Sequence, residues 1–379
     1  MQTVCLFGAS GTMGFSAFKE LWKRRKNYRI VLLLRPSQKN LNLMRPYIKQ
    51  AGLNQIDGEI TVENAQFKIV WGDATKYEDV HTAIKGADWV LNAMAFISPM
   101  ADYYPETARA VNIEAIANIL KAIEEEPEGV ERIHYIHTGT VAETGDRLPP
   151  IHWGRVGDPL KPSVFDYYAI TKIEGERMVM ESKLRFWASL RLTYIVPTDY
   201  REMMALSDAI MFHQPVNSCM ENVSDRSAGL GLINCLDIED DSLFWRKAYN
   251  MGGGPEMRCT AKELMSASME LLGLSGVEAC FDREWFALQN FHMQYYLDSH
   301  KLNDYLHYWG DSMEDCWLEM EKTMPFGLKV LRVLCTNFPF IRKQVEAQTK
   351  ERMRKMVTEH RNGTMHWRTH ENLPRIIAF

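Results

Sequence analysis

The N-terminal stretch MQTVCLFGASGTMG constrains the fold of this chain more than any other. Thr3 to Phe7 is a short β-branched and apolar run, which is typical of a strand buried on both faces of a sheet. The run ends in Gly8, Gly11 and Gly14, and the residues from Phe15 to Trp22 then take up helical spacing. A strand, a glycine turn and a helix in this order predict the opening of a mononucleotide-binding βαβ unit.

Each glycine has a physical role in such a unit. Gly8 permits a tight turn, Gly11 lets backbone N–H groups approach a pyrophosphate, and Gly14 lets the helix pack closely on the strand. The phosphate charge then lies at the helix N-terminus, where free N–H groups and the helix dipole favour it. The spacing is GxxGxxG and not GxGxxG, so an ordinary strand–helix turn is the alternative. The cofactor contacts predicted from this loop are Gly8, Ser10, Gly11, Thr12, Met13 and Gly14.

Composition and length are those of an ordinary globular protein. The 379 residues suffice for one large domain or two modest ones, and 46% of them are apolar and 25% charged. A net charge of −5 argues against a nucleic-acid-binding surface over the whole molecule. The seven cysteines form no CxxC pair, so we expect reduced thiols in a cytoplasmic protein and neither disulfides nor a zinc site. We expect no signal peptide and no membrane-spanning segment.

The residues after the second expected strand bear on the choice of cofactor. Arg29 to Leu34 (RIVLLL) has the composition of a buried strand. In NAD sites an acidic residue at the end of this strand binds the ribose 2′-OH. Here the strand is followed by RPSQK, which contains no carboxylate, and a guanidinium suits a phosphate. The sequence therefore predicts NADP, bound by Arg35 with Ser37 or Lys39 assisting, with NAD possible. A solvated arginine is the alternative.

Two further strands continue the pattern. Phe67 to Trp71 leads into Gly72 and Asp73, and Asp73 either accepts the adenine amino group or caps the helix that follows. Asp88 to Asn92 leads into small residues, which would let the strand end pass close to a flat cofactor. The predicted cofactor contacts at these two strand ends are Asp73, Ala74, Asn92, Ala93 and Met94.

A tyrosine and a lysine four residues apart provide the candidate catalytic pair. Arg132 to His137 is a fifth expected strand, followed by Thr138, and Phe165 to Glu181 has the spacing of a helix that carries Tyr168 and Lys172. On a helix these two side chains share a face. A nearby ammonium lowers the pKa of a phenol from its reference value of about 10. The Thr138 hydroxyl can hold a substrate carbonyl oxygen against the phenol. Taken alone, such a pair is more simply explained as a surface tyrosine and a solvated lysine.

The pair does not occur alone. The segments GASGTMG, GDAT, NAMA, VNIEAIANIL, HTGTV and YAITK come in the order and approximate spacing of the extended branch of the short-chain dehydrogenase/reductase family. From Met1 to about residue 275 the chain resembles this family and its NAD-dependent epimerase/dehydratase-like members. The later match is weaker, since LRLT at 190–193 has Leu where the family's RPT segment has Pro, although AYNMGGG at 248–254 resembles a late family segment. The residues from Arg35 to Ser37 resemble the NADP-preferring reductases of the branch more than its NAD-dependent sugar epimerases.

The resemblance implies a catalytic set. Tyr168 would be the general acid/base, and Lys172 would be its electrostatic partner and a ligand of the cofactor ribose, so both would contact the cofactor. Thr138 would take the place of the usual serine, and Asn112 would take the supporting asparagine position. Thr193, at the weaker strand-end match, would lie against the cofactor.

The strand and helix order, together with the resemblance, predicts an α/β fold: a Rossmann doubly wound parallel sheet with a smaller C-terminal substrate lobe. We expect the NAD(P)-binding domain over 1–195 with a late strand near 247–254, a discontinuous substrate lobe over 196–330, and a basic helical extension over 331–379. Segments 197–214 and 280–309 are rich in Met and aromatic residues, which suit an apolar ligand but are equally what a small core contains.

The C-terminal region carries two further features. Phe326 to Ile341 is apolar with Lys329 and Arg332 interspersed, and a basic amphipathic helix of this kind can lie on a membrane surface. Such helices more often pack on their own domain or on a partner subunit, so membrane contact is the less favoured interpretation. His366 and His370 share a helical spacing, but no carboxylate or cysteine completes a metal set, so we expect a solvated tail and no metal.

These features predict a cytoplasmic NADP(H)-dependent oxidoreductase that reduces a ketone or aldehyde, or oxidises the alcohol, of a small and apolar molecule by hydride transfer. Two alternatives stay open: a nucleotide-sugar epimerase or dehydratase with bound NAD, and a regulator that senses NADP without turnover. Arg35 counts against the first, and the presence of Tyr168, Lys172 and Thr138 counts against the second. The expected partners are a small-molecule substrate and a second copy in a homodimer, with no nucleic acid.

Overall fold

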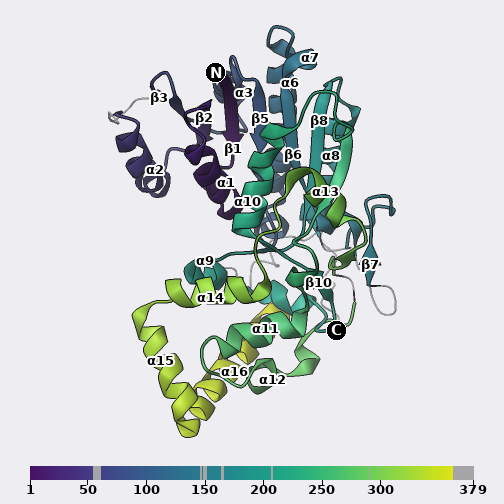
Figure 1. Cartoon of the computed structure of the whole chain (residues 1–379). Coiled ribbons are helices and arrows are strands. Elements are labelled where there is room, and N and C mark those ends of the chain that lie inside the picture. Colours follow the sequence, from purple (N-terminus) through teal and green to yellow (C-terminus); the bar gives the residue numbers. More distant parts are fainter. Residues whose placement is uncertain are drawn as a thin grey trace.

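The computed structural model describes residues 1–53, 61–145, 147, 152–163, 166–205, 208–289 and 291–361. Eight strands form its main sheet: β1 (Gln2–Phe7), β2 (Tyr28–Leu34), β3 (Thr61–Glu63), β4 (Phe67–Trp71), β5 (Trp89–Asn92), β6 (His134–Thr140), β8 (Phe186–Leu192) and β12 (Lys247–Met251). Their order is β12-β8-β6-β5-β1-β2-β4-β3, and every neighbouring pair is parallel except β3 with β4 (Figure 1). The predicted Rossmann doubly wound sheet is confirmed, with β1 in its interior.

Helices cover both faces of this sheet, which explains why its strands are almost continuously apolar. One face is covered by α1 (Thr12–Lys23), α2 (Gln38–Gln50), α10 (Asp225–Asn234) and α13 (Ser299–Leu306). The other is covered by α3 (Tyr77–Ile84), α6 (Ala115–Glu125) and α8 (Tyr167–Glu181). Along β1, Val4 and Leu6 pack into the first layer, whereas Cys5 and Phe7 pack into the second. The strand is therefore buried on both faces, as its composition indicates.

The helix expected around 108–122 is divided. α5 (Pro105–Arg109) passes into one π-helical turn, η1 (Ala110–Glu114), before α6 begins. Such turns are frequent at functional sites. This one carries Asn112, and a Cβ on Gly175 of α8 would lie 2.6 Å from the Asn112 carbonyl oxygen. Because glycine has no side chain, Gly175 allows α8 to pack closely against the π turn.

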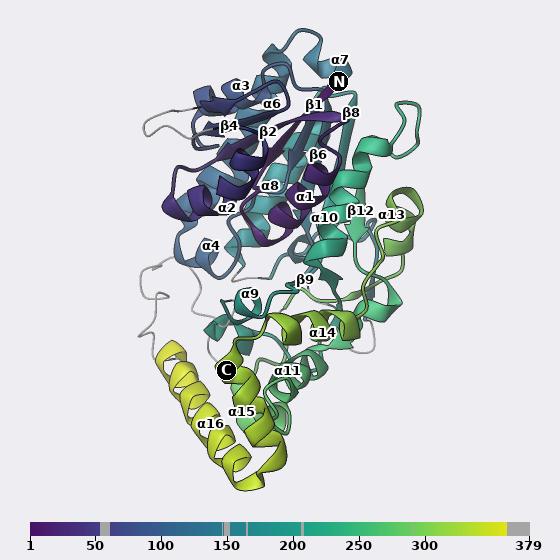
Figure 2. The same ribbon diagram turned by 60° about the vertical axis from the view of Figure 1, so that its left-hand side comes forward.

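The rest of the chain forms a smaller lobe below the sheet (Figures 1 and 2). Its short strands pair two by two: β9 (Ile195–Val196) with β11 (Val223–Ser224), β10 (Cys219–Glu221) with β13 (Arg258–Thr260), and β7 (Trp153–Gly154) with β14 (Tyr295–Tyr296). Its helices include α9 (Tyr200–Ala205), α11 (Ala261–Glu270), α12 (Val277–Cys280) and α14 (Met313–Thr323).

The Met- and aromatic-rich segments mostly form the core of this lobe. Phe212, Phe281, Trp285 and Phe286 are buried in one apolar cluster, and the rings of Phe212 and Phe286 are 5.4 Å apart. Because these side chains pack against one another, their abundance is no evidence for an apolar ligand. All seven cysteines are free thiols, as expected.

The C-terminal region departs from its prediction. The helix expected over 326–341 ends early: α15 (Phe326–Asn337) is followed by Phe338 in an extended conformation, and α16 (Pro339–Arg361) then begins. A proline disfavours the helical conformation of the residue before it and is well accepted in a first helical turn, so Pro339 ends one helix and opens the next. The two helices form a hairpin at the end of the lobe far from the sheet (Figure 2).

Two other expectations concern this end of the chain. His366 and His370 lie outside the described residues. Among the residues that are described, no helix combines the length and the apolar character needed to cross a membrane.

Helix α1 packs closely against α10 and is connected to the start of the lobe by hydrogen bonds through Asp225. A Cβ on Gly229 of α10 would lie 2.6 Å from the backbone nitrogen of Ala17, so the two helices touch backbone to backbone. The Ser16 hydroxyl donates to one oxygen of the Asp225 carboxylate at 2.5 Å. The other oxygen accepts from the N–H and the hydroxyl of Thr198, at 2.9 and 2.8 Å. Thr198 lies two residues after the end of β9, at the start of the lobe.

Gly229→Ala tests this packing. In a helix, Ala is more favourable than Gly by about 1 kcal/mol, but overpacking a close contact costs about 1–3 kcal/mol. Here the obstructing atom belongs to the backbone and cannot rotate away, so we expect a net loss of roughly 1–2 kcal/mol in the free energy of unfolding, measured by denaturant titration. Gly327→Ala in α15 is the control, because its new Cβ would have no neighbour within 4 Å. Equal stability of the two variants would contradict the contact.

Candidate active site

The glycine loop lies at the carboxyl end of the sheet, against the residues that follow β5. Gly8 has a φ of +80°, and a Cβ there would lie 2.7 Å from the carbonyl carbon of Ala93. A Cβ on Gly14 would overlap the Gly8 carbonyl oxygen. A side chain at either position would collide with backbone atoms, so glycine is required at Gly8 for the tight turn and at Gly14 for the close packing of α1 on that turn.

The first turn of α1 completes this cradle. Gly11 precedes the helix without a side-chain cap, and the first turn contains no acidic residue. The first N–H groups of a helix have no partner within it and favour an anion. Ser10 and Thr12 are half-buried beside them, and Met13 is buried below. The residues present thus fit the pyrophosphate of a dinucleotide.

The residues predicted to determine the preference for NADP over NAD follow the end of β2. Arg35, Ser37 and Lys39 are exposed. The Arg35 carbonyl accepts from the side chain of Asn40 at 2.9 Å, and the Ser37 hydroxyl caps α2 by accepting the Asn40 N–H at 3.2 Å. Within the described part of the chain, the Arg35 guanidinium makes neither a hydrogen bond nor an ion pair. It remains available to an anion beyond the strand end.

Asp73 caps a turn after β4. One of its carboxylate oxygens accepts from the N–H and the hydroxyl of Thr75, both at 2.9 Å. Lys76 occupies the N-cap position of α3 and makes no side-chain capping bond, so Asp73, three residues earlier, is not the N-cap residue of that helix. The neighbouring Ala74 carbonyl accepts from the side chain of Asn118 at 3.0 Å. The second Asp73 oxygen is left for the predicted adenine contact, which stays a prediction.

The end of β5 lies beside the glycine loop. The buried Asn92 side chain accepts the N–H of Met94 at 3.1 Å, and this contact turns the chain away from the strand. Ala93 and Met94 are half-buried there. Thr193, just after β8, is buried with its hydroxyl against the Tyr296 phenol, so it contacts a lobe residue.

Helix α8 carries Tyr168 and Lys172 on the side that faces the end of β6. The helix begins at Tyr167, and Phe165, where its start was expected, lies outside the described residues. Lys172 is buried, and its ammonium donates to the Thr138 carbonyl at 2.5 Å. Burial lowers the pKa of Lys172 to about 8, although the nearby Glu143 and Glu176 carboxylates act in the opposite direction.

The hydroxyl beside the phenol belongs to Thr140 and not to the predicted Thr138. The Thr140 side chain hydrogen-bonds with Tyr168. The Thr138 hydroxyl is buried and donates to the Asn92 carbonyl at 2.9 Å. Side chains alternate along a strand, so the two threonines share a face, and only the later one reaches the open end of β6. The Thr138 hydroxyl therefore links β6 to β5 by a hydrogen bond. The Thr140 hydroxyl lies where it can bind the same substrate oxygen as Tyr168.

The pKa of the Tyr168 phenol is shifted in the direction opposite to the one predicted. Burial raises it, and the neighbouring Glu143 and Asp166 carboxylates add to this effect, while the bond with Thr140 lowers it only partly. The Lys172 ammonium is bound to a backbone carbonyl. In this arrangement the phenol holds its proton at neutral pH, which is the state of a proton donor.

Asn112 does not reach the catalytic pair. Its side chain donates to the Phe96 carbonyl and to the Thr171 hydroxyl, both at 3.0 Å, and accepts the Phe96 N–H at 2.8 Å. It joins the loop after β5 to α8, one residue before Lys172. Asn112 therefore positions this part of the site from the π turn.

A cluster of buried charges lies beneath the site. The Arg191 guanidinium of β8 contacts both oxygens of Glu176, at 2.6 Å for the shortest pair, and lies 3.2 Å from Glu143. Glu143 also accepts the N–H of Thr140 at 3.0 Å and closes a capping box with it. Burial and the adjacent Glu176 carboxylate raise the pKa of Glu143 well above its usual range, whereas Arg191 lowers the pKa of Glu176 despite its burial.

A second acidic cluster surrounds the start of α8. Asp166 caps the helix by accepting the Ala169 N–H at 2.9 Å, and its other oxygen lies 2.7 Å from Nδ1 of His292 in the lobe. Asp102 accepts the Ser98 hydroxyl at 2.5 Å and the Tyr167 N–H at 2.8 Å. Burial and the neighbouring Asp166 carboxylate raise the pKa of Asp102 to about 7.

Sequence reasoning missed several members of these clusters. Glu176 lies four residues after Lys172 on the same helix, so the spacing already places it on the catalytic face. Arg191 is a charge inside an otherwise apolar strand, which indicates a buried partner. His292 gives no such signal, because it meets Asp166 only through the packing of the lobe.

Comparisons with known proteins agree with this arrangement. A sequence model of the 3-beta hydroxysteroid dehydrogenase/isomerase family matches residues 32–190. No curated protein matches the chain in sequence. A dTDP-glucose 4,6-dehydratase from Bacillus anthracis, in complex with NAD, superposes with a TM-score of 0.62 at 13% identity, over 85% of this chain and 96% of that one.

Two further solved structures are similar. DesIV, a dTDP-glucose 4,6-dehydratase from Streptomyces venezuelae with NAD and DAU bound, gives a TM-score of 0.63 at 15% identity, over 85% and 96% of the two chains. The UDP-Glc/GlcNAc 4-epimerase from Campylobacter jejuni gives 0.61 at 13% identity, over 87% and 99%. At such identities the likeness establishes a shared fold.

The raised pKa of Asp102 predicts a pH dependence of stability. In the unfolded chain this carboxyl titrates near 3.8 and in the folded protein near 7, so the folded state binds the proton more tightly. The contribution of Asp102 to stability is therefore largest below about pH 4 and is lost as the pH rises toward 7. We expect Asp102→Asn to raise the melting temperature at pH 8 by roughly 2–4 °C, and to have a smaller effect at pH 5, measured by calorimetry.

Asp241→Asn, on an exposed loop, is the control and should give no difference between the two pH values. An equal gain for Asp102→Asn at pH 5 and pH 8 would show that the carboxyl is not protonated by the fold.

Proposed function

We propose that this chain is a member of the extended branch of the short-chain dehydrogenase/reductase family, and that it interconverts nucleotide-linked sugars by oxidising and re-reducing one hydroxyl-bearing carbon. The net reaction is an epimerisation. The observation that carries the proposal is the contact of the Tyr168 phenol with the Thr140 hydroxyl beside the glycine-loop cradle. The solved structures of similar fold include an epimerase and two dehydratases that act on such sugars.

Three side chains have separate roles in the proposed reaction. A bound nicotinamide supplies a hydride acceptor and donor. The Tyr168 oxygen takes the proton of the substrate hydroxyl when that carbon is oxidised, and returns it when the carbonyl is reduced. The Thr140 hydroxyl holds the same substrate oxygen. Lys172 places a positive charge beneath the strand end, bound to the Thr138 carbonyl, where it is available to an adjacent cofactor ribose.

Epimerisation is favoured over dehydration by the residues that follow Thr140. Elimination of water from a sugar needs a further acid and base over the ring. Val141 and Ala142 are apolar and buried, and the Glu143 carboxyl is turned toward Arg191. Among the described residues that directly follow Thr140, the carboxyl group of Glu143 is thus engaged with Arg191 and not free for such a step.

A second candidate is the reduction of an apolar ketone or aldehyde. One observation favours it, the match to the 3-beta hydroxysteroid dehydrogenase/isomerase family model. Assays of UDP- and dTDP-sugars with either NAD or NADP, and of apolar ketones with either NADH or NADPH, separate the two candidates. A new sugar isomer in the first assay supports the epimerase, whereas net consumption of reduced nicotinamide in the second supports the reductase.

In whichever assay gives turnover, Tyr168→Phe removes the proton donor and keeps the shape of the ring. We expect turnover to fall by roughly 10²–10⁴, with cofactor affinity within a few fold of the parent protein. Thr140→Ala should lower turnover by roughly 10–10³, because one hydrogen bond to the reacting oxygen is lost. Thr138→Val is the matched control: it should cost stability, by about 1 kcal/mol, and spare turnover. The reverse order of the two threonine variants would overturn the placement of Thr140.

The choice of cofactor is a separate part of the proposal. We infer a preference for NADP, because the exposed Arg35 guanidinium is free at the end of β2 and no carboxylate follows that strand. Arg35→Asp should weaken NADPH relative to NADH by about 1–3 kcal/mol, measured as dissociation constants by calorimetry. Arg45→Asp makes the same change of charge on the exposed side of α2 and should leave the ratio unchanged. Unchanged relative affinities in Arg35→Asp would exclude this role.

A further inference from the structure

The hairpin of α15 and α16 stands at the far end of the lobe, and both views place the turn between its helices away from the sheet (Figures 1 and 2). One side of the hairpin is part of the lobe core. Leu331 and Cys335 of α15 pack in the same apolar cluster as Met353 and Val357 of α16. The hairpin is therefore held in place by its inner face.

The opposite face of α15 is apolar and uncovered. Phe326, Val330 and Val333 follow one another at steps of four and three residues, so they form a stripe on one side of the helix. The exposed fractions are 81% for Phe326 and 58% for Val333. Phe338 and Phe340 follow at the turn after α15 and are also exposed, Phe340 to 69%. Large exposed apolar stripes on a folded protein mark contact surfaces.

The surroundings of this stripe are basic. Residues 325–361 contain nine Lys and Arg against three Glu, in a chain whose net charge is −5. Five of these cations are in ion pairs with acidic residues, so the hairpin keeps a smaller positive excess than the count alone gives. Lys343 is exposed one turn after Phe340 on the same face of α16. Lys329 lies beside Val330, and its ammonium binds the Lys322 carbonyl.

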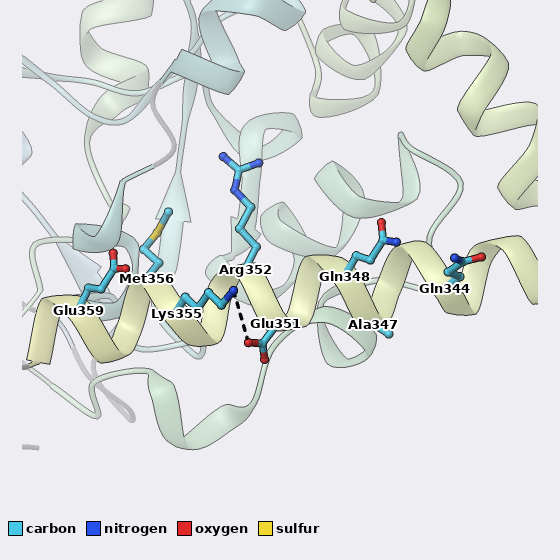
Figure 3. Close-up of a pocket in the computed structure, with 8 residues that line it drawn as sticks. All are labelled: Gln344, Ala347, Gln348, Glu351, Arg352, Lys355, Met356 and Glu359. Carbon is cyan, nitrogen blue, oxygen red and sulfur yellow. Dashed lines mark ion pairs between the residues drawn. The ribbon is translucent and has the colours of Figure 1, made fainter.

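The outward face of α16 limits the contact to α15 and the turn. A groove along this face is lined by Ala347 and Met356 and, for the rest, by polar side chains, and an ion pair joins Glu351 to Lys355 (Figure 3). The polar side chains are those of Gln344, Gln348, Glu351, Arg352, Lys355 and Glu359. These polar side chains are not suited to apolar contact. The apolar surface is thus a narrow strip that ends in two phenylalanines at a protruding turn.

We propose that this strip, formed by Phe326, Val330, Val333, Phe338 and Phe340 with the adjacent Lys329 and Lys343, binds the surface of an anionic lipid bilayer. The aromatic rings enter the boundary between headgroups and acyl chains, and the ammonium groups lie at the lipid phosphates. Charge decides between a bilayer and a second copy of this chain. A symmetric dimer through the strip would bring two positive hairpins together, whereas an anionic surface complements them.

The test is flotation of the full-length protein with vesicles of phosphatidylcholine alone and of phosphatidylcholine mixed with phosphatidylglycerol. We expect binding to the anionic vesicles only, and release as the salt concentration rises. Phe326→Ser with Phe340→Ser should lower the bound fraction by about tenfold or more. Leu243→Ser is the matched control, because Leu243 is 76% exposed on the nucleotide-binding side of the molecule, far from the hairpin.

A second pair of variants tests whether positive charge contributes to vesicle binding. Lys343→Glu should weaken binding to the anionic vesicles severalfold, and Lys183→Glu, an equally exposed lysine after α8, should not. Equal binding by parent protein and double Phe variant would overturn the proposal, as would no binding to either vesicle. A dimer in solution that the Phe variant converts to monomer, without vesicle binding, would assign the strip to self-association and equally overturn it.

Discussion

The candidate site depends on one buried ion pair, between Arg191 of β8 and Glu176 of α8. Isolated charges are costly to bury, and this pair is tolerated because the guanidinium and the carboxylate make parallel hydrogen bonds. Gly139 of β6 makes room for it, since a Cβ there would lie 2.9 Å from the Arg191 side chain. Helix α8 cannot slide along the sheet without separating these charges. The ion pair between Arg191 and Glu176 therefore fixes the position of Tyr168 over the end of β6.

The same cluster sets the electrostatics of the catalytic pair. Lys172 is buried between a backbone carbonyl and two carboxyl groups, and Glu143 shares Arg191 with Glu176. Glu143 also caps the turn that presents Thr140, so a change in its charge would act on both the threonine and the lysine. The site is thus one connected unit, in which the groups that touch a substrate are supported by groups that cannot reach it.

Much of this architecture could be predicted because local chemistry determines it. Gly8, Gly11 and Gly14 are required by a tight turn and by close packing, and these constraints are visible in a single segment. Thr138 was chosen over Thr140 because a sequence does not show where a strand ends, and the two residues share a face. The wrong direction for the pKa of Tyr168 has a similar cause, since burial and the approach of Asp166 and Glu143 depend on distant parts of the chain. The break at Pro339, by contrast, was available from the sequence.

The bond between Ser16 and Asp225 has a consequence for how ligands act on one another. Asp225 joins α1, the helix that follows the glycine loop, to Thr198 in the segment that leads into the lobe. A displacement of α1 on binding an anion at its N-terminus would act through this carboxylate on that segment. Thermodynamic reciprocity then requires that a ligand which draws the lobe toward the sheet tightens or loosens the cofactor by the same factor. The Asp225 carboxylate would thereby couple cofactor binding by the sheet domain to ligand binding by the lobe.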